Sequence, residues 1–335
     1  MSVRWPVVVR TVLYGILGAL FLGSLLAIGI TGPVIARKEP RLKMTIDVSA
    51  ERLRNDVVRL AREFVPRDST NPANLDRAAA WIAAELRGAG LEVEIQTYDA
   101  RGSFYHNVIG FRAGLEPTAP VRVLGAHYDA YGPHPGADDN ASGVAVLLEV
   151  VRTLQPEAPR HGQYFVAFST EEPPFFATSD MGSRRFAERL VERGIAVDLM
   201  IALDVVGYFD EAAGSQSFPF PGLGLLYPSR GNFIAVVGDT WAGPWIRQVK
   251  QSLLSGSDLM VHSFRGPAFV PGVLWSDHRS FRELGLPGVL VTDTAFLRNR
   301  RYHAADDTPE TLDYERMADL VRGLQGLLWD RDVSE

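Results

Sequence analysis

Five short stretches of the chain each contain one or two side chains of the kinds that hold metal ions. They are residues 125–129 (GAHYD), 136–143 (GADDNASG), 169–172 (STEE), 202–204 (ALD) and 302–303 (YH). Zinc accepts both imidazole nitrogens and carboxylate oxygens as ligands. Together the stretches predict a hydrolytic site with two zinc ions, because a pair of metals can polarise a carbonyl and hold the attacking water.

Five residues are the predicted ligands: His127, Asp138, Glu172, Asp204 and His303. If Glu172 is a ligand, Glu171 is free to act as the general base, since a carboxylate beside an activated water can take its proton. Asp129 follows His127 by two residues and is expected to orient its ring. The chain has no cysteine, so a thiolate site is excluded.

Each of these residues also has an ordinary structural interpretation. Residues 138–140 can be a turn and helix cap, with Asp139 or Asn140 as the capping residue. A single histidine such as His127 is often a core residue. Asp204 distinguishes the two interpretations best, because it lies within an apolar run of the sequence. A carboxylate buried there costs free energy unless it is paired or binds a metal.

Hydrophobic periodicity predicts strands that alternate with helices, which is typical of an α/β three-layer sandwich with a mostly parallel mixed sheet. The predicted helices are 49–65, 73–86, 140–154, 182–193, 241–254 and 309–329, and the predicted strands are 92–98, 107–111, 121–126, 163–168, 199–206, 233–237 and 288–292. His127, Glu171, Glu172 and Asp204 come where predicted strands end. Ligands of open α/β sheets collect at this edge.

The segment 208–232 is rich in glycine, proline and aromatic residues and directly follows a ligand-bearing strand. A long irregular segment at this place is either a surface loop or a lid over the site. The aromatic residues Phe218, Phe220 and Tyr227 favour a lid insertion.

The first 44 residues are predicted to be a membrane anchor and tether, and residues 45–335 the catalytic domain. Residues 11–30 are uncharged over a length that can span a hydrocarbon core. A secretory signal usually has a shorter apolar core, although residues 34–36 can be read as a cleavage site. Basic residues flank the span on both sides, so its orientation is open, and we expect the catalytic domain outside the cytoplasm.

The composition argues against one class of partner. The net charge is −6 and the pI is about 5.7, whereas nucleic-acid binding usually requires a basic face. The expected partners are peptide substrates and, through the N-terminal segment, a membrane. The sequence leaves the oligomeric state open.

From about Ser49 to Trp329 the chain resembles the co-catalytic dizinc aminopeptidase family that includes bacterial leucyl aminopeptidases and glutaminyl cyclases. The resemblance rests on the order of the five stretches, on residues 275–278 (WSDH) and on residues 303–310 (HAADDTPE). It implies that Asp138 bridges the two metals and that Glu171 is the base. It further implies that His127 and Asp204 hold one metal, and that Glu172 and His303 hold the other. Asp277 and Tyr302 are expected to bind substrate.

The resemblance implies an aminopeptidase, and three alternatives remain. A glutaminyl cyclase shares most of these motifs but needs one zinc and no attacking water. A non-catalytic receptor on this fold would lack a ligand or the base, and a carboxypeptidase would bind the other end of the peptide. Residues 173–181, which separate the Glu171–Glu172 pair from Gly182, depart from the family pattern and are expected to reshape the substrate pocket.

Overall fold

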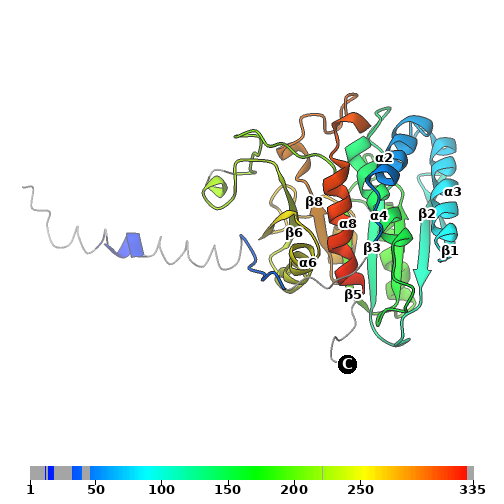
Figure 1. Cartoon of the computed structure of the whole chain (residues 1–335), viewed down its shortest axis with the longest axis horizontal. Helices are drawn as coiled ribbons and strands as arrows, with labels where there is room; N and C mark the ends of the chain where they lie inside the picture. Colours follow the sequence, from blue (N-terminus) through cyan, green and yellow to red (C-terminus); the bar gives the residue numbers. More distant parts are fainter. Residues whose placement is uncertain (1–11, 13, 19–31, 40–45, 221, 330–335) are drawn as a thin grey trace, which may run out of the picture.

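The structure is a computed structural model that describes residues 12, 14–18, 32–39, 46–220 and 222–329 (Figure 1). Helices α2 to α8 and strands β1 to β8 follow one another with short irregular helical turns between them. In chain order the elements are α2 (Ala50–Val58), η1 (Arg59–Glu63), α3 (Pro72–Gly88), β1 (Glu92–Ala100), β2 (Ser103–Arg112), β3 (Val121–His127), η2 (Ala137–Ser142), α4 (Gly143–Arg152), β4 (Gln163–Phe168), α5 (Gly182–Glu192), β5 (Val197–Leu203), η3 (Leu223–Leu225), β6 (Phe233–Asp239), α6 (Gly243–Gly256), β7 (Met260–Gly266), α7 (His278–Glu283), β8 (Val289–Thr292), η4 (Ala295–Leu297), η5 (Pro309–Thr311) and α8 (Tyr314–Leu328).

The strands form one mixed sheet of eight, in the order β1-β2-β4-β3-β5-β8-β6-β7. The neighbours β4, β3, β5 and β8 run parallel, and so do β6 and β7. The pairs β1–β2, β2–β4 and β6–β8 are antiparallel. The predicted mixed, mostly parallel sheet is therefore confirmed. Its central parallel strands all point their carboxyl ends at the same edge.

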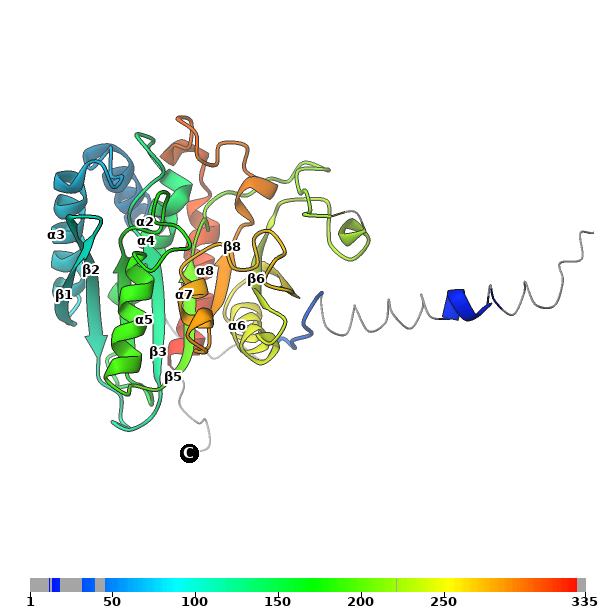
Figure 2. The same ribbon diagram turned by 180° about the vertical axis from the view of Figure 1, so that it is seen from behind.

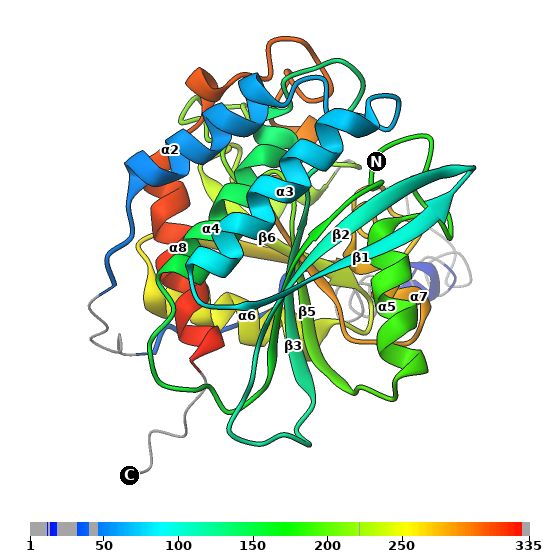
Figure 3. The same cartoon turned by 90° about the vertical axis from the view of Figure 1, so that its right-hand side faces the viewer.

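Helices cover both faces of the sheet, which gives the predicted three layers. On one face, α2, α3, α4, α6 and α8 bury their apolar sides in a single cluster with side chains of the strands (Figure 3). On the other face, α5 and α7 pack through Phe186 and Phe281 on Val123, Met200 and other strand residues (Figure 2). Adjacent residues of a strand point to opposite faces, so Val123 and Leu124 belong to different clusters.

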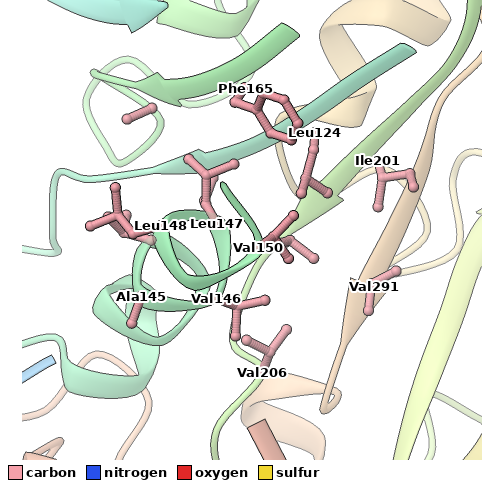
Figure 4. Packing of buried hydrophobic residues seen from close by; sticks show 14 of the residues in the cluster. Leu124, Ala145, Val146, Leu147, Leu148, Val150, Phe165, Ile201, Val206 and Val291 are labelled. Carbon is pink, nitrogen blue, oxygen red and sulfur yellow. The ribbon is translucent and has the colours of Figure 1, made fainter. Parts of the chain in front are cut away.

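Helix α4 lies at the centre of the larger cluster and supports the strands that carry the site. Val146, Leu147 and Val150 of α4 are fully buried next to Leu124 of β3 and Ile201 of β5 (Figure 4). A fully buried aliphatic side chain contributes roughly 1.5–3 kcal/mol of transfer free energy. This packing holds the ends of β3 and β5 in fixed positions.

Several boundaries differ from prediction, and two elements were not predicted. The helix predicted over 140–154 begins only at Gly143, because Asp139 and Asn140 have non-helical backbone angles. The helix predicted over 309–329 divides into η5 and α8, where the Asp313 side chain caps the second part. Strand β7 was missed because it is only partly apolar, and helix α7 because it has six residues, most of them polar.

Most of the predicted membrane span, residues 11–30, lies outside the described residues. Within the part of the chain that the structure describes, no helix combines the length and apolar character needed to cross a bilayer.

Candidate metal centre

Three parallel strands bring four of the predicted site residues to one edge of the sheet. His127 is the last residue of β3, Glu171 and Glu172 follow β4, and Asp204 directly follows β5. β3 lies between β4 and β5. These four side chains therefore lie at the carboxyl ends of adjacent parallel strands, as predicted.

The ligand-type side chains form two groups that share one residue, Asp139. In the first group, Nε2 of His127 lies 3.4 Å from Oδ1 of Asp139 and 3.4 Å from Oδ1 of Asp204. In the second, Nε2 of His303 lies 3.0 Å from Oδ2 of Asp139 and 3.4 Å from Oε2 of Glu172. The two oxygens of Asp139 thus face different groups, which is the arrangement expected of a carboxylate that bridges two cations.

The bridging position was predicted for Asp138, whereas in this structure the next residue, Asp139, is the one that belongs to both groups. Asp138 belongs to neither group, because its carboxylate points away and accepts hydrogen bonds from the Gly207 amide (3.0 Å) and from Nδ2 of Asn299 (2.9 Å). Asp139 has φ −106° and ψ 91°, so the chain bends there and presents successive side chains in different directions. The carboxylate of Asp307 holds this turn by accepting the amides of both aspartates.

The residues present fit a pair of cations. The carboxylates of Asp139, Glu172 and Asp204 are nearly inaccessible to solvent, and buried charges require a partner of opposite charge. Oε1 of Glu172 is buried without a hydrogen-bond partner among the described residues. Nε2 of His303 and Oδ2 of Asp139 are close, yet neither completes a hydrogen bond. Oxygen and imidazole donors of this kind suit zinc.

Asp129 holds both His127 and the loop after β4. Nδ1 of His127 lies 3.2 Å from the backbone oxygen of Asp129 and 3.5 Å from its Oδ1. A proton on Nδ1 leaves Nε2 free to face Asp139 and Asp204. The carboxylate of Asp129 accepts hydrogen bonds from the amides of Glu171 (3.2 Å) and Glu172 (3.1 Å). Asp129 therefore positions the base and two ligands.

We expect Asp129→Asn to weaken metal binding by about 10- to 100-fold, the range observed for loss of an outer hydrogen-bond partner. The two amides are accepted by different oxygens of Asp129, and Asn replaces one of these oxygens with an NH₂ donor, so the Glu171–Glu172 loop must shift. Zinc affinity by competition with a chelator measures the effect. Asp306→Asn, which changes an exposed carboxylate of the same loop region as His303, is the control and should bind zinc normally. Equal affinity in both variants would contradict the assigned role.

Glu171, the predicted general base, lies beside the ligand groups without belonging to either. Its Oε2 lies 3.9 Å from Nε2 of His127, and the side chain belongs to neither ligand group. Burial raises its pKa well above the ordinary value for a glutamate, against the opposing effect of His127. Burial also raises the pKa of Glu172, to about 8, and that of Asp277, to about 7. A carboxylate with a raised pKa accepts a proton more readily, which suits Glu171 to proton transfer.

The pKa values of the two candidate histidine ligands are also raised, but by neighbouring charges and not by burial. Burial lowers the pKa of His303, but the carboxylates of Asp139 and Glu172 outweigh burial and raise it to about 10. Burial also lowers the pKa of His127, but nearby carboxylates, including Asp204 and Glu171, outweigh burial and raise it well above the ordinary value. Asp139 shows the reciprocal effect, because the two histidines outweigh burial and lower its pKa. The carboxylates thus favour the protonated form of both histidines, whereas a metal ligand has to be the neutral imidazole.

Backbone strain occurs at three positions at or beside the candidate site residues. Thr170, Val205 and His303 have positive φ angles of 58°, 49° and 59°, although none is glycine. Thr170 precedes Glu171, Val205 follows Asp204, and His303 is itself a candidate ligand. Such conformations cost about 1–3 kcal/mol each and are found mainly at functional sites. The surrounding packing therefore stabilises the chain where it turns side chains into the centre.

Two aromatic rings hold His303, which is the most exposed of the candidate ligands. Tyr131 stacks on its imidazole at 4.0 Å with 1° between the planes, and Tyr302 stacks on the other side at 3.9 Å with 16°. The rings restrict the imidazole to an orientation that faces Asp139 and Glu172. Tyr302 was predicted to be a site residue. Tyr131 was not, because no spacing rule links it to His303 across the sequence.

Arg67 is a second residue that sequence reasoning missed. Its side chain is fully buried and donates hydrogen bonds to the backbone oxygens of Leu60, Tyr128, Pro135 and Gly136. Burial lowers its pKa to about 10, so it remains charged at neutral pH. Arg67 thus fixes the loop between β3 and η2, and its positive charge interacts with nearby carboxylates, including Asp139 and Asp307. An arginine in a short loop sequence such as residues 65–69 (VPRDS) carries no sequence signal of such a role.

We expect Arg67→Met to reduce the free energy of unfolding by about 3–5 kcal/mol, because the carbonyl groups it binds lose their partner in a buried place. Denaturant unfolding with and without zinc measures the change. Arg87→Met, at an exposed position of α3, should leave stability within roughly 0.5 kcal/mol of the native protein. A similarly small change for Arg67→Met would contradict this account.

An apolar pocket opens beside the first ligand group. It has a volume of about 120 Å³, and Asp204 and Tyr302 lie at its boundary. The predicted lid segment, 208–232, supplies part of its wall through Phe218, Leu223 and Tyr227. In this structure the segment therefore forms part of the pocket wall. Asp277 is buried near the site and does not line this pocket, so its predicted contact with substrate stays a prediction.

Comparison with known proteins agrees with this geometry. Residues 107–326 match Peptidase family M28. The uncharacterized protein YfbL of Escherichia coli is 42% identical over 290 residues, which cover 84% of this chain and 88% of YfbL. Leucine aminopeptidase 1 of Uncinocarpus reesii is 26% identical over 228 residues, 64% of this chain and 52% of the fungal protein, so the match spans about half of that relative.

Solved structures share the fold at low sequence identity. The LapA aminopeptidase of Legionella pneumophila superposes with a TM-score of 0.67 at 18% identity, covering 85% of this chain and 74% of LapA. A glutaminyl cyclase of Bacteroides thetaiotaomicron gives 0.64 at 18% identity, covering 85% and 99%. The family match therefore includes every residue of the two ligand groups. This chain belongs to peptidase family M28.

Proposed function

We propose that the protein is a zinc aminopeptidase that binds two ions and removes N-terminal residues from peptides. The observation that carries this proposal is the position of Asp139, whose two oxygens face two separate ligand groups. A glutaminyl cyclase, which needs one zinc, has no use for both groups. A non-catalytic protein has no use for Glu171 beside them.

Bound zinc would supply Lewis-acid polarisation of the peptide carbonyl and acidify the attacking water. His127, Asp139 and Asp204 would hold one ion, and Asp139, Glu172 and His303 the other. The Glu171 carboxylate takes a proton from the water and later delivers it to the leaving amine. Asp129 keeps this carboxylate in place through the amide of Glu171.

The charge of the site favours binding of an amino terminus over a carboxyl terminus. Carboxylates dominate its buried groups, and none of the described residues that line the adjacent pocket is a lysine or an arginine. Arg67 donates to backbone oxygens and does not line the pocket. Two zinc ions would balance the charge of the ligand carboxylates, so the buried carboxylates outside the ligand groups, such as Glu171 and Asp277, are the ones that would attract a free α-amino group. The apolar pocket would accept the side chain of the N-terminal residue.

We also propose that residues 11–30 anchor the protein in a membrane with the catalytic domain outside the cytoplasm. The support is the uncharged length of the segment, which matches the thickness of a hydrocarbon core.

Metal content and product analysis on the purified full-length protein test the proposed activity. We expect close to two zinc ions per chain and release of N-terminal residues from peptides with apolar amino termini. One zinc with formation of pyroglutamate from glutaminyl peptides would assign the cyclase reaction instead. Release from the carboxyl end, or no turnover with zinc bound, would also overturn the proposal.

A further inference from the structure

The body of the protein begins very close to the end of the apolar segment. Residues 11–30 are uncharged, and Gly32 already pairs with Arg265 of the edge strand β7, with hydrogen bonds of 2.9 and 3.1 Å between their backbones. Consecutive Cα atoms are about 3.8 Å apart, so at most roughly 8 Å separate Ile30 from Gly32. This is about the thickness of one polar headgroup layer. A segment that spans the bilayer therefore places β7 at its surface.

The residues after Gly32 are fixed to the body along the edge of the sheet. Val34 is buried; its amide donates to Oγ of Ser263 (3.0 Å), and its carbonyl accepts from Nζ of Lys250 (3.0 Å). Further on, the amide of Glu39 donates to Oγ of Ser255 (2.8 Å). A docked segment of this kind does not act as a flexible linker. It fixes which side of the body faces the place where the apolar segment ends.

Exposed apolar side chains lie on this side of the molecule. Leu225 is 91% exposed, Leu226 50% and Phe220 41%. The adjacent Tyr227 donates its hydroxyl to the backbone oxygen of Ser263 (2.8 Å), the same residue that holds Val34. The turn η3 projects from the body on the side where the N-terminal segment leaves it (Figures 1 and 2). Single exposed leucines are common in soluble proteins, whereas a group of this kind marks an interaction surface.

We propose that Phe220, Leu225 and Leu226 contact the interface of the lipid bilayer that holds the apolar segment. The proposal rests on the membrane anchoring proposed above and is independent of the peptidase reaction. A bilayer is the occupant that the position favours, because the chain enters it within two residues of β7 and the exposed side chains lie beside the same strand. Apolar side chains at the headgroup boundary add binding energy to an anchor.

This position has a consequence for the substrate. Leu223 and Tyr227 line the apolar pocket beside Asp204, and Leu225 lies between them in the sequence. The wall of the pocket and the membrane contact are thus opposite sides of one short turn. The pocket is then held close to the bilayer surface, where peptides with apolar or membrane-associated amino termini are concentrated.

Site-specific labelling of the full-length protein in vesicles tests the contact, and the absence of native cysteine makes it simple. An environment-sensitive fluorophore is attached at Leu225→Cys, at Leu115→Cys and at Ile16→Cys, and quenching by brominated lipid is measured. Leu115 is 61% exposed in the loop before β3 and serves as the matched control. We expect quenching and a blue shift at positions 16 and 225, and neither at 115.

The three labels separate the possible failures. Quenching at position 16 without quenching at 225 would overturn the proposed contact while the anchor stands. No quenching at position 16 would contradict the anchoring and the contact with it. A blue shift at 225 that brominated lipid does not quench, together with energy transfer between labelled copies, would assign the surface to a second copy of the chain and overturn the lipid contact. None of these readouts depends on peptidase activity.

Discussion

Glu171→Gln is expected to keep both zinc ions and to lower kcat by about 10²- to 10⁴-fold, the usual contribution of a general base. Glutamine has nearly the same shape as glutamate, but its side chain cannot accept a proton from water. Because Glu171 belongs to neither ligand group, its charge is not needed to hold the metals. Metal content and steady-state kinetics on an aminoacyl amide, measured on the same preparation, check both halves of the prediction.

Glu172→Gln is the matched control, since it makes the same chemical change one residue further along the chain. Glu172 lies 3.4 Å from Nε2 of His303 within the second ligand group. The control should therefore lose zinc as well as activity. Full activity of Glu171→Gln would show that another group takes the proton, and loss of zinc from it would place Glu171 among the ligands.

Much of the fold follows from local sequence patterns because its elements are long and strongly periodic. The helix predicted over 49–65 begins at Ala50, and the Ser49 side chain caps it by accepting the amide of Arg52. The apolar strands β3, β4 and β5 were each predicted within a few residues. The parts that were missed, β7 and α7, are stabilised by contacts with distant residues, such as Gly32 on β7 and Phe186 near Phe281. Periodicity within a short window cannot report such contacts.

The candidate site was predicted better by region than by residue. His127, Glu171, Glu172 and Asp204 could be placed together because parallel strands end at one edge of the sheet. Residues that act through backbone contacts, such as Arg67, leave no comparable pattern. Which of two adjacent aspartates faces the centre depends on the turn angles at Asp139, and these are set by Asp307, far away in the sequence.

Asp139 and Asp138 therefore provide the most direct test of the metal centre. Asp139→Ala removes an oxygen from each ligand group, so we expect the zinc affinity of both sites to fall. The fall should exceed the range of about 10- to 100-fold that is typical when an outer hydrogen-bond partner of a ligand is lost. Activity should be lost with the metal. Calorimetric titration of the metal-free protein with zinc measures both sites, and circular dichroism confirms that the variant is folded.

Asp138→Asn is the control that separates the two assignments. Asn at this position keeps a side-chain oxygen that can accept the Gly207 amide, while its amide nitrogen meets Nδ2 of Asn299 and weakens that contact. The effect should be a moderate loss of stability with two zinc ions still bound. The opposite result, zinc lost from Asp138→Asn and retained by Asp139→Ala, would restore Asp138 as the bridge. Asp139→Asn makes the same substitution at the neighbouring residue, so a difference in zinc binding between Asp138→Asn and Asp139→Asn would arise from the direction in which the turn points each carboxylate.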